Sequence, residues 1–146
     1  MAVLSAAECP QIEAIVHDGG PARLSSAIAG RGIEHGVPRW LSNGVARLTV
    51  AVTSLRVGIN LFRYEPIRWA KHIAPRPILF IHGRQDPYTT PQEFEGYVKA
   101  AGTNASAWIV EQASHRNVDA FHPQEYRQRV VDFFIRAFDD AERKTR

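Results

Sequence analysis

The sequence predicts an α/β fold in which parallel strands alternate with helices. Two stretches, Pro77–Gly83 (PILFIHG) and Ser106–Val110 (SAWIV), are apolar runs of strand length. Such a continuous run is typical of a strand that is buried on both faces of a sheet. A capped helix lies between the two stretches and an amphipathic helix follows the second. Strand, helix, strand and helix in this order indicate parallel strands joined by right-handed crossovers.

The first residues predict one more helix and one more strand. Residues 2–8 (AVLSAAE) form a short run of small residues with helical character, and Pro10 stops it. The run that follows predicts a strand at Ile12–His17, within "IEAIVHD". Gly19, Gly20 and Pro21 end this strand in a turn.

Residues 21–64 are the segment that the pattern leaves least decided. Glycines at positions 30, 32, 36 and 44 break it up, with Trp40 among them. The apolar run Val45–Val57 fits a helix by its length, whereas an alternation within it also fits a strand, and we favour the helix. For Trp40 and Trp69 we expect apolar core packing, although either side chain would also suit the wall of a pocket.

Three helices are predicted in the second half of the chain. Glu65–Ile73 (EPIRWAKHI) is a short one with proline in its first turn. Thr90–Glu93 (TPQE) is a capping box that starts the second, which Gly102 ends. The third begins at Pro123 and carries an apolar stripe made of Tyr126, Val130, Phe133, Phe134, Ala137 and Phe138.

Length and composition exclude several classes of protein. The 146 residues suffice for one domain, and 45% apolar with 23% charged residues is ordinary for a globular chain. The net charge of +3 comes from scattered basic residues without a nucleic-acid motif, so we expect no nucleic-acid partner. A single cysteine, Cys9, and the lack of a membrane-length apolar run or signal peptide predict a cytoplasmic protein with no membrane partner.

Asp86 and His115 follow two consecutive predicted strands and are the candidate catalytic residues. The loops after consecutive parallel strands emerge at the same edge of the sheet, so these side chains should meet. An aspartate there can accept a hydrogen bond from the Nδ1–H of the imidazole, which leaves the other ring nitrogen free as a general base. We expect His82 to be structural, hydrogen-bonded to the backbone, and His122 to have a capping role beside Pro123.

No metal or cofactor is predicted. A metal site would need ligands at a characteristic spacing along the chain. No pair among the candidate histidines has such a spacing, the candidates being His17, His35, His82 and His115.

The series "HGRQD", capped helix, "AWIV", "ASH" and amphipathic helix resembles the C-terminal part of the α/β-hydrolase fold. The likeness is to the bacterial esterases and peptidases related to prolyl oligopeptidases and dienelactone hydrolases, in "IAPRPILFIHGRQDP" above all. The resemblance implies that Asp86 is the acid and His115, 29 residues later, the base of a Ser-Asp-His triad. Ser114 stands where this family usually has glycine.

The nucleophile of such a triad is missing. No G-x-S-x-G occurs in the chain, and none of its serines (5, 25, 26, 42, 54, 106 and 114) lies in a strand-to-helix elbow. The opening "MAVLSAAECPQIEAIV" resembles the helix after the elbow and the next strand. The resemblance therefore implies one incomplete α/β-hydrolase domain: residues 1–20 after the elbow, a cap-like insertion at 21–64, and the strand-Asp-helix-strand-His-helix unit at 65–146.

The expected function is that of a C-terminal part of a serine hydrolase that cleaves ester or peptide bonds in small-molecule or peptide substrates. Without a nucleophile the chain alone should be inactive. The alternative is a non-catalytic α/β module, a pseudoenzyme or partner-binding domain. We also expect self-association, because the outer edge of the strand Ile12–His17 would lack a partner and the helix at 2–8 would have a partly uncovered apolar face.

Overall fold

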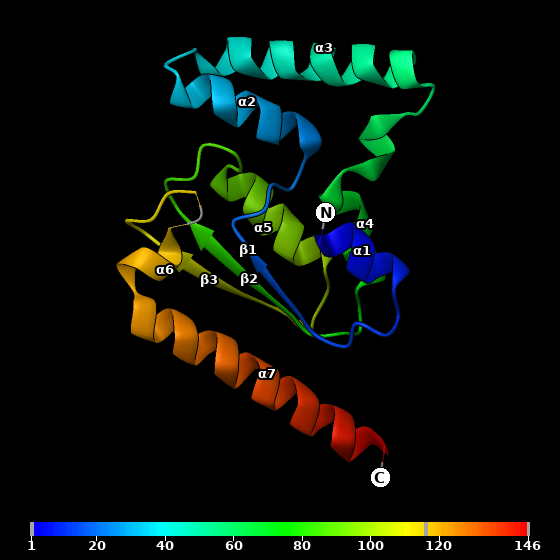
Figure 1. The fold of residues 1–146 in the computed structure, drawn as a ribbon, viewed down its shortest axis with the longest axis vertical. Coiled ribbons are helices and arrows are strands. Elements are labelled where there is room, and N and C mark those ends of the chain that lie inside the picture. The colour runs from blue at the N-terminus through cyan, green and yellow to red at the C-terminus, as the bar shows by residue number, and fades with distance from the viewer. Residues whose placement is uncertain (1, 116, 146) are drawn as a thin grey trace.

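A computed structural model describes residues 2–115 and 117–145 (Figure 1). In these residues one sheet has three strands, β1 (Ile15–Asp18), β2 (Ile78–Gly83) and β3 (Ala105–Val110), in the order β1-β2-β3. Both pairings are parallel. The predicted class, α/β with about three parallel strands flanked by helices, is confirmed.

The helices form layers on the two faces of the sheet and beyond its carboxyl edge. In Figure 1, α5 and α1 lie with α4 on one face, α6 and α7 lie on the other, and α2 and α3 cover the edge where the strands end. The helical elements are α1 (Ala2–Glu8), α2 (Leu24–Glu34), α3 (Arg39–Val57), η1 (Leu61–Tyr64), α4 (Pro66–Trp69), η2 (Ala70–His72), α5 (Pro91–Ala100), α6 (Val118–Phe121) and α7 (Pro123–Thr145).

β2 is the centre of the core, and its side chains alternate between two apolar clusters. Every residue of β2 is buried, as the continuous apolar run predicts. Ile78 and Phe80 belong to the cluster that includes Phe94 and Tyr97 of α5. Leu79 and Ile81 belong to the opposite cluster, which is completed by residues of β3, α6 and α7. A strand with a period of two can fill both layers only when both its faces are apolar.

The strand boundaries differ from the prediction by one to three residues. β1 begins at Ile15 rather than Ile12, because the carbonyl of Ile12 accepts a hydrogen bond from the Arg76 guanidinium (2.8 Å) instead of joining the sheet. Pairing starts where the Ile15 amide donates to the Pro77 carbonyl at 3.1 Å. Among the described residues β1 has a strand neighbour on one side only, as expected for an edge.

The helix at residues 2–8 is confirmed as α1, but the expectation of a partly uncovered apolar face is wrong for Val3 and Ala6. Val3 and Ala6 are 0% and 1% exposed and belong to the same core cluster as Ala70 and Ile73. The segment from α4 through η2 packs against α1 and covers its apolar side.

Residues 21–64 form mainly two antiparallel helices, α2 and α3. The helical interpretation of Val45–Val57 is confirmed, and the helix begins earlier, at Arg39. The glycines at 30, 32 and 44 lie inside helices and do not break them, which corrects the prediction. A Cβ on Gly32 would lie 2.7 Å from the Ser42 hydroxyl, so close packing of α2 on α3 explains this glycine. Gly36, with φ of 80°, makes the turn between them.

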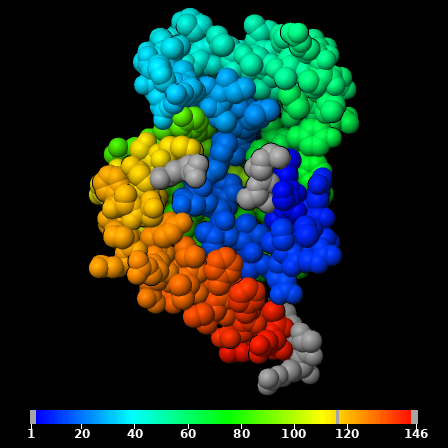
Figure 2. Space-filling model, viewed as in Figure 1, coloured from blue at the N-terminus to red at the C-terminus, as the bar shows by residue number. Residues whose placement is uncertain are grey.

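The outer face of α3 carries exposed apolar side chains. Core packing is wrong for Trp40, which is 76% exposed, whereas Trp69 is half-buried against the core and donates its indole N–H to the Arg63 carbonyl. Figure 2 shows α2, in lighter blue, and α3, from cyan to green, as a layer at one end of the molecule, opposite α7. The large exposed residues of this helix are Trp40, Leu41, Val45, Leu48, Val52, Leu55 and Val57.

The helices of the second half largely match their predictions. The capping box is present: the Glu93 amide donates to the Thr90 hydroxyl at 3.2 Å, and the Thr90 amide donates to the Glu93 carboxylate at 3.3 Å. The apolar stripe of α7 packs on the sheet at Phe133, but Phe138 is 50% exposed. The loop after β3, predicted without regular structure, contains the short helix α6.

Candidate functional site

The structure brings Asp86 and His115 together at the carboxyl ends of β2 and β3. The Asp86 Oδ2 and His115 Nδ1 atoms are 2.9 Å apart, which is a hydrogen-bond distance. The Asp86 side chain is fully buried, and that of His115 is 26% exposed. The acid is therefore shielded from water while the imidazole can reach a ligand.

Local contacts fix the orientation of the Asp86 carboxylate. Its Oδ1 accepts the Tyr88 amide at 2.6 Å, and its own amide donates to the Gly83 carbonyl at 3.1 Å in a tight turn. A buried carboxylate needs such donors, since a carboxylate without partners is costly to remove from water. Oδ1 is thus bound to the backbone and Oδ2 faces the imidazole.

Gly83 lets the two loops approach each other. A Cβ at this position would lie 2.4 Å from the carbonyl oxygens of Ala113 and Ser114. The Gln85 amide also donates to the Ala113 carbonyl at 3.0 Å. The sequence predicts only that Gly83 ends a strand. Its position between a buried strand and the loop that carries Asp86 is the signal by which its role in the close approach of the loops could have been found.

The loop before His115 is held by Asn117, which sequence reasoning did not single out. The Asn117 Oδ1 accepts the Ser114 amide at 2.8 Å. The Ser114 hydroxyl points toward the Gln85 carbonyl at 3.4 Å. This serine thus adds a contact between the two loops.

The hydrogen bond to Asp86 determines which ring nitrogen of His115 is available. A carboxylate accepts, so Nδ1 carries the proton, and Nε2 has no hydrogen-bond partner among the described residues. The Tyr88 ring packs on the imidazole with a centroid distance of 4.3 Å. In this arrangement Nε2 can accept a proton from a bound group, as a general base does.

Two other histidines near the site have different environments. His82 Nδ1 is 3.9 Å from the Asp86 carboxylate, beyond hydrogen-bond distance, and its ring stacks on Phe94. Burial lowers the pKa of His82, although the Asp86 charge and a backbone hydrogen bond at Thr89 oppose that shift. A neutral His82 does not compete for Asp86. His122 joins α6 to α7, and its carbonyl accepts the Tyr126 amide at 2.8 Å.

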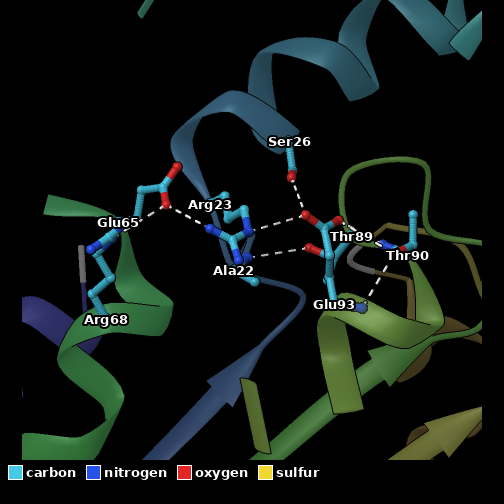
Figure 3. A network of polar contacts seen from close by, with 8 residues as sticks. All are labelled: Ala22, Arg23, Ser26, Glu65, Arg68, Thr89, Thr90 and Glu93. Atoms are coloured by element: carbon cyan, nitrogen blue, oxygen red, sulfur yellow. Dashed lines mark hydrogen bonds and ion pairs between the residues drawn. The ribbon is translucent and has the colours of Figure 1, made fainter. Parts of the chain in front are cut away.

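A polar network holds α2 against the sheet unit, residues 65–145, beside this site (Figure 3). Arg23 lies between two carboxylates, with its Nη1 at 2.8 Å from Glu65 and its Nε at 3.5 Å from Glu93. The Ser26 hydroxyl also donates to Glu93 at 2.7 Å. Glu93 therefore has two roles, in the capping box of α5 and in anchoring α2, and only the first was predicted from the sequence.

The described residues lack both a metal cluster and a membrane-spanning helix. They contain no group of three or more His, Cys, Asp or Glu side chains placed to hold a metal ion. Nor does any helix in that part of the chain combine the length and apolar character needed to cross a membrane.

Comparisons with known proteins agree with this fold. Neither protein-family profiles nor curated protein sequences give a match to the chain. Crystal structures of the esterase Pf2001 from Pyrococcus furiosus are similar to this chain. One superimposes with a TM-score of 0.64 at 20% sequence identity, and another crystal form with a TM-score of 0.63 at 24% sequence identity. Each alignment covers 92% of this chain and 48% of the esterase, so the chain spans about half the esterase's length. The chain thus has a partial α/β-hydrolase fold.

Proposed function

We propose that the chain supplies the acid and base of a serine hydrolase active site, with Asp86 orienting His115 and His115 transferring protons. The observation that carries the proposal is the 2.9 Å hydrogen bond between their side chains, made across the loops of two adjacent parallel strands. The likeness to an esterase supports ester hydrolysis within this proposal, and peptide hydrolysis would use the same groups. No cofactor is needed.

The proposed steps follow from the tautomer of His115. Nε2 takes the proton of a serine hydroxyl as the serine oxygen attacks the ester carbonyl, and Asp86 stabilises the resulting imidazolium. The imidazolium then gives the proton to the departing alkoxide. In the second half-reaction Nε2 takes a proton from water as the water oxygen attacks the acyl-serine. The imidazolium then returns that proton to the serine oxygen as the carboxylic acid leaves, which restores the free serine and the neutral His115.

The serine itself must come from outside these 146 residues, because they contain no G-x-S-x-G. Ser114 is the serine nearest to His115 in the chain, but its hydroxyl faces the Gln85 carbonyl. We therefore propose that the chain works as part of a larger hydrolase, and its single cysteine is in keeping with a cytoplasmic setting.

The first test is the activity of the 146-residue chain toward p-nitrophenyl acetate. We expect turnover no faster than that of the His115→Ala variant, with no burst that titrates an active site. A saturable burst would contradict the assignment of the nucleophile to another segment.

The second test is the in-frame coding sequence immediately before Met1. A G-x-S-x-G encoded there, followed by fluorophosphonate labelling of the extended protein that depends on His115, would support the hydrolase. Its absence would favour the alternative, a non-catalytic α/β module, for which the lack of a nucleophile in the chain is the supporting observation.

A further inference from the structure

A cavity of about 470 Å³ lies beside the candidate site, between the helix pair α2–α3 and the sheet unit. One wall is a face of α3, where Arg39, Asn43 and Arg47 follow at intervals of four residues. The lining also includes Arg23, at the start of α2, and Arg68 of α4. The volume is within the range of sites for small molecules, which is about 300–1,000 Å³.

The charges that line this cavity do not balance. Its lining contains four arginines and two carboxylates, those of Glu65 and Glu93. The Glu65 carboxylate is almost fully buried and pairs with Arg23 at 2.8 Å and Arg68 at 3.8 Å. Glu93 is satisfied by the contacts already described, to Arg23 among others. Both carboxylates are therefore already neutralised by groups of the network.

The two arginines of α3 have no such partner. Neither Arg39 nor Arg47 makes an ion pair or side-chain hydrogen bond with any residue that the structure describes. Two guanidinium groups that line one concavity, without an acid to face them, concentrate positive potential there and raise the local concentration of anions. The planar fork of a guanidinium matches a carboxylate or a phosphate with two hydrogen bonds.

We propose that this cavity binds an anionic group of a small organic ligand, a carboxylate or a phosphate, through Arg39 and Arg47. As a description of the substrate, an ester that carries an acidic group, the inference rests on the proposed function. As a description of a binding site it does not, because the charges and the cavity exist whether or not His115 takes part in hydrolysis.

The position of the cavity relates the anionic group to the candidate site. Pro87 and Tyr88 follow Asp86 in the chain and line the cavity. The Tyr88 ring lines the cavity and also packs on the His115 imidazole, with a centroid distance of 4.3 Å. Helix α2 presses on this ring, since a Cβ on Gly30 would lie 2.6 Å from it. Tyr88 therefore belongs both to the cavity lining and to the surroundings of His115, and the substrate form of the inference requires a ligand that reaches from the arginines past Tyr88 to Nε2.

Isothermal titration calorimetry of the 146-residue chain with three probes tests the proposal. Monomethyl glutarate carries the carboxylate, dimethyl glutarate is its neutral counterpart, and phenyl phosphate represents the phosphate source. We expect Arg47→Gln and Arg39→Gln each to raise the Kd of the bound anion on the order of tenfold, because each variant loses charge-assisted hydrogen bonds to the anion. Arg56→Gln is the matched control, since Arg56 is on the same helix but outside the cavity lining.

The outcomes distinguish a carboxylate ligand from a phosphate ligand, and they distinguish this inference from the proposed hydrolase function. Tighter binding of monomethyl glutarate than of its dimethyl ester assigns a carboxylate, and tighter binding of phenyl phosphate assigns a phosphate. Binding of neither anion, or equal weakening by Arg56→Gln, overturns the inference. Thermal melts confirm that the variants fold. Since no step depends on hydrolysis, a failed activity test leaves this result intact, and a failed binding test leaves the Asp86–His115 proposal intact.

Discussion

The sheet unit, residues 65–145, and the helix pair α2–α3 are held by different forces. β2 is buried along its whole length and its side chains fill two apolar clusters. In α3 only Ser42, Ala46 and Val50 are buried, all of them small or medium in size. The sheet unit thus has an apolar core, whereas α3 places its large apolar residues on the outside.

The contacts between the two regions are mainly polar. Arg23, Ser26 and the Ala22 amide bind Glu65, Glu93 and Thr89 on the sheet unit. The close contact of Gly30 with Tyr88 adds packing at one point. The Asp86–His115 geometry therefore belongs to the sheet unit with its apolar core, whereas the cavity beside it depends on a helix pair that is attached mainly through polar groups. Such a region opens at a lower free energy than the core does.

The largest effect we expect is a pH dependence that arises within the sheet. Burial lowers the pKa of His17, on β1, from its ordinary 6.5 to about 4. Between these values the unfolded chain binds a proton that the folded chain does not, so the free energy of unfolding falls as the pH drops from 6.5 to 4. The shift corresponds to about 3 kcal/mol.

Urea denaturation across this pH window in the wild type and in His17→Leu measures that effect. The difference in slope between the two proteins isolates His17 from the carboxylates, and the buried His82 acts in the same direction in both. Equal slopes would show that His17 is not held neutral by the fold.

The second prediction concerns Gly83, where the two site loops approach. Gly83→Ala places a Cβ 2.4 Å from two carbonyl oxygens, so the loops must separate, at a cost of about 1–3 kcal/mol in unfolding free energy. Gly96→Ala is the matched control, because its nearest neighbour would be 3.9 Å away. Chemical denaturation should show the loss for Gly83→Ala alone, and equal effects at both positions would contradict the close approach.

The third prediction distinguishes two surfaces for self-association, and we expect the outer edge of β1 to carry it. The amides of Ile15 and Gly19 donate inward to β2, so the Val16 amide between them should point outward. Val16→Pro removes that donor and should weaken association about tenfold, or about 1.4 kcal/mol. Sedimentation equilibrium measures this change.

The comparison variant for that measurement is the double change Leu48→Glu with Val52→Glu on the exposed face of α3. Dissociation by this variant alone would move the interface to the helix pair. A wild-type chain that stays monomeric at high micromolar concentration would refute self-association altogether.

The smallest effect separates two glycines within the helix pair. A Cβ added at Gly44 would have no atom within 4 Å, so Gly44→Ala should raise the unfolding free energy by up to about 1 kcal/mol through helix propensity. Gly30→Ala, with Tyr88 at 2.6 Å, should lower it. Thermal melts that move in the same direction for both variants would show that α2 does not pack on Tyr88.

The sequence was sufficient to predict the sheet unit because its signals are local. A buried strand, a capping box and an acid just past a strand end are visible in consecutive residues, and topology alone brings Asp86 near His115. The helix pair was not predictable in this way. Gly30 and Gly32 are ordinary helix breakers until their tertiary neighbours, Tyr88 and Ser42, are known. The pairing of Arg23 with Glu65 likewise joins residues far apart in the chain.

The central claim, that Asp86 holds His115 as an acid–base pair, is tested most directly by the ring ¹⁵N chemical shifts of His115 in the neutral imidazole. In the wild type we expect the tautomer with the proton on Nδ1, because the carboxylate accepts at 2.9 Å. In Asp86→Asn the side-chain amide can donate instead, which should shift the population toward the Nε2–H tautomer. A His115 tautomer that is the same in both proteins would contradict the account.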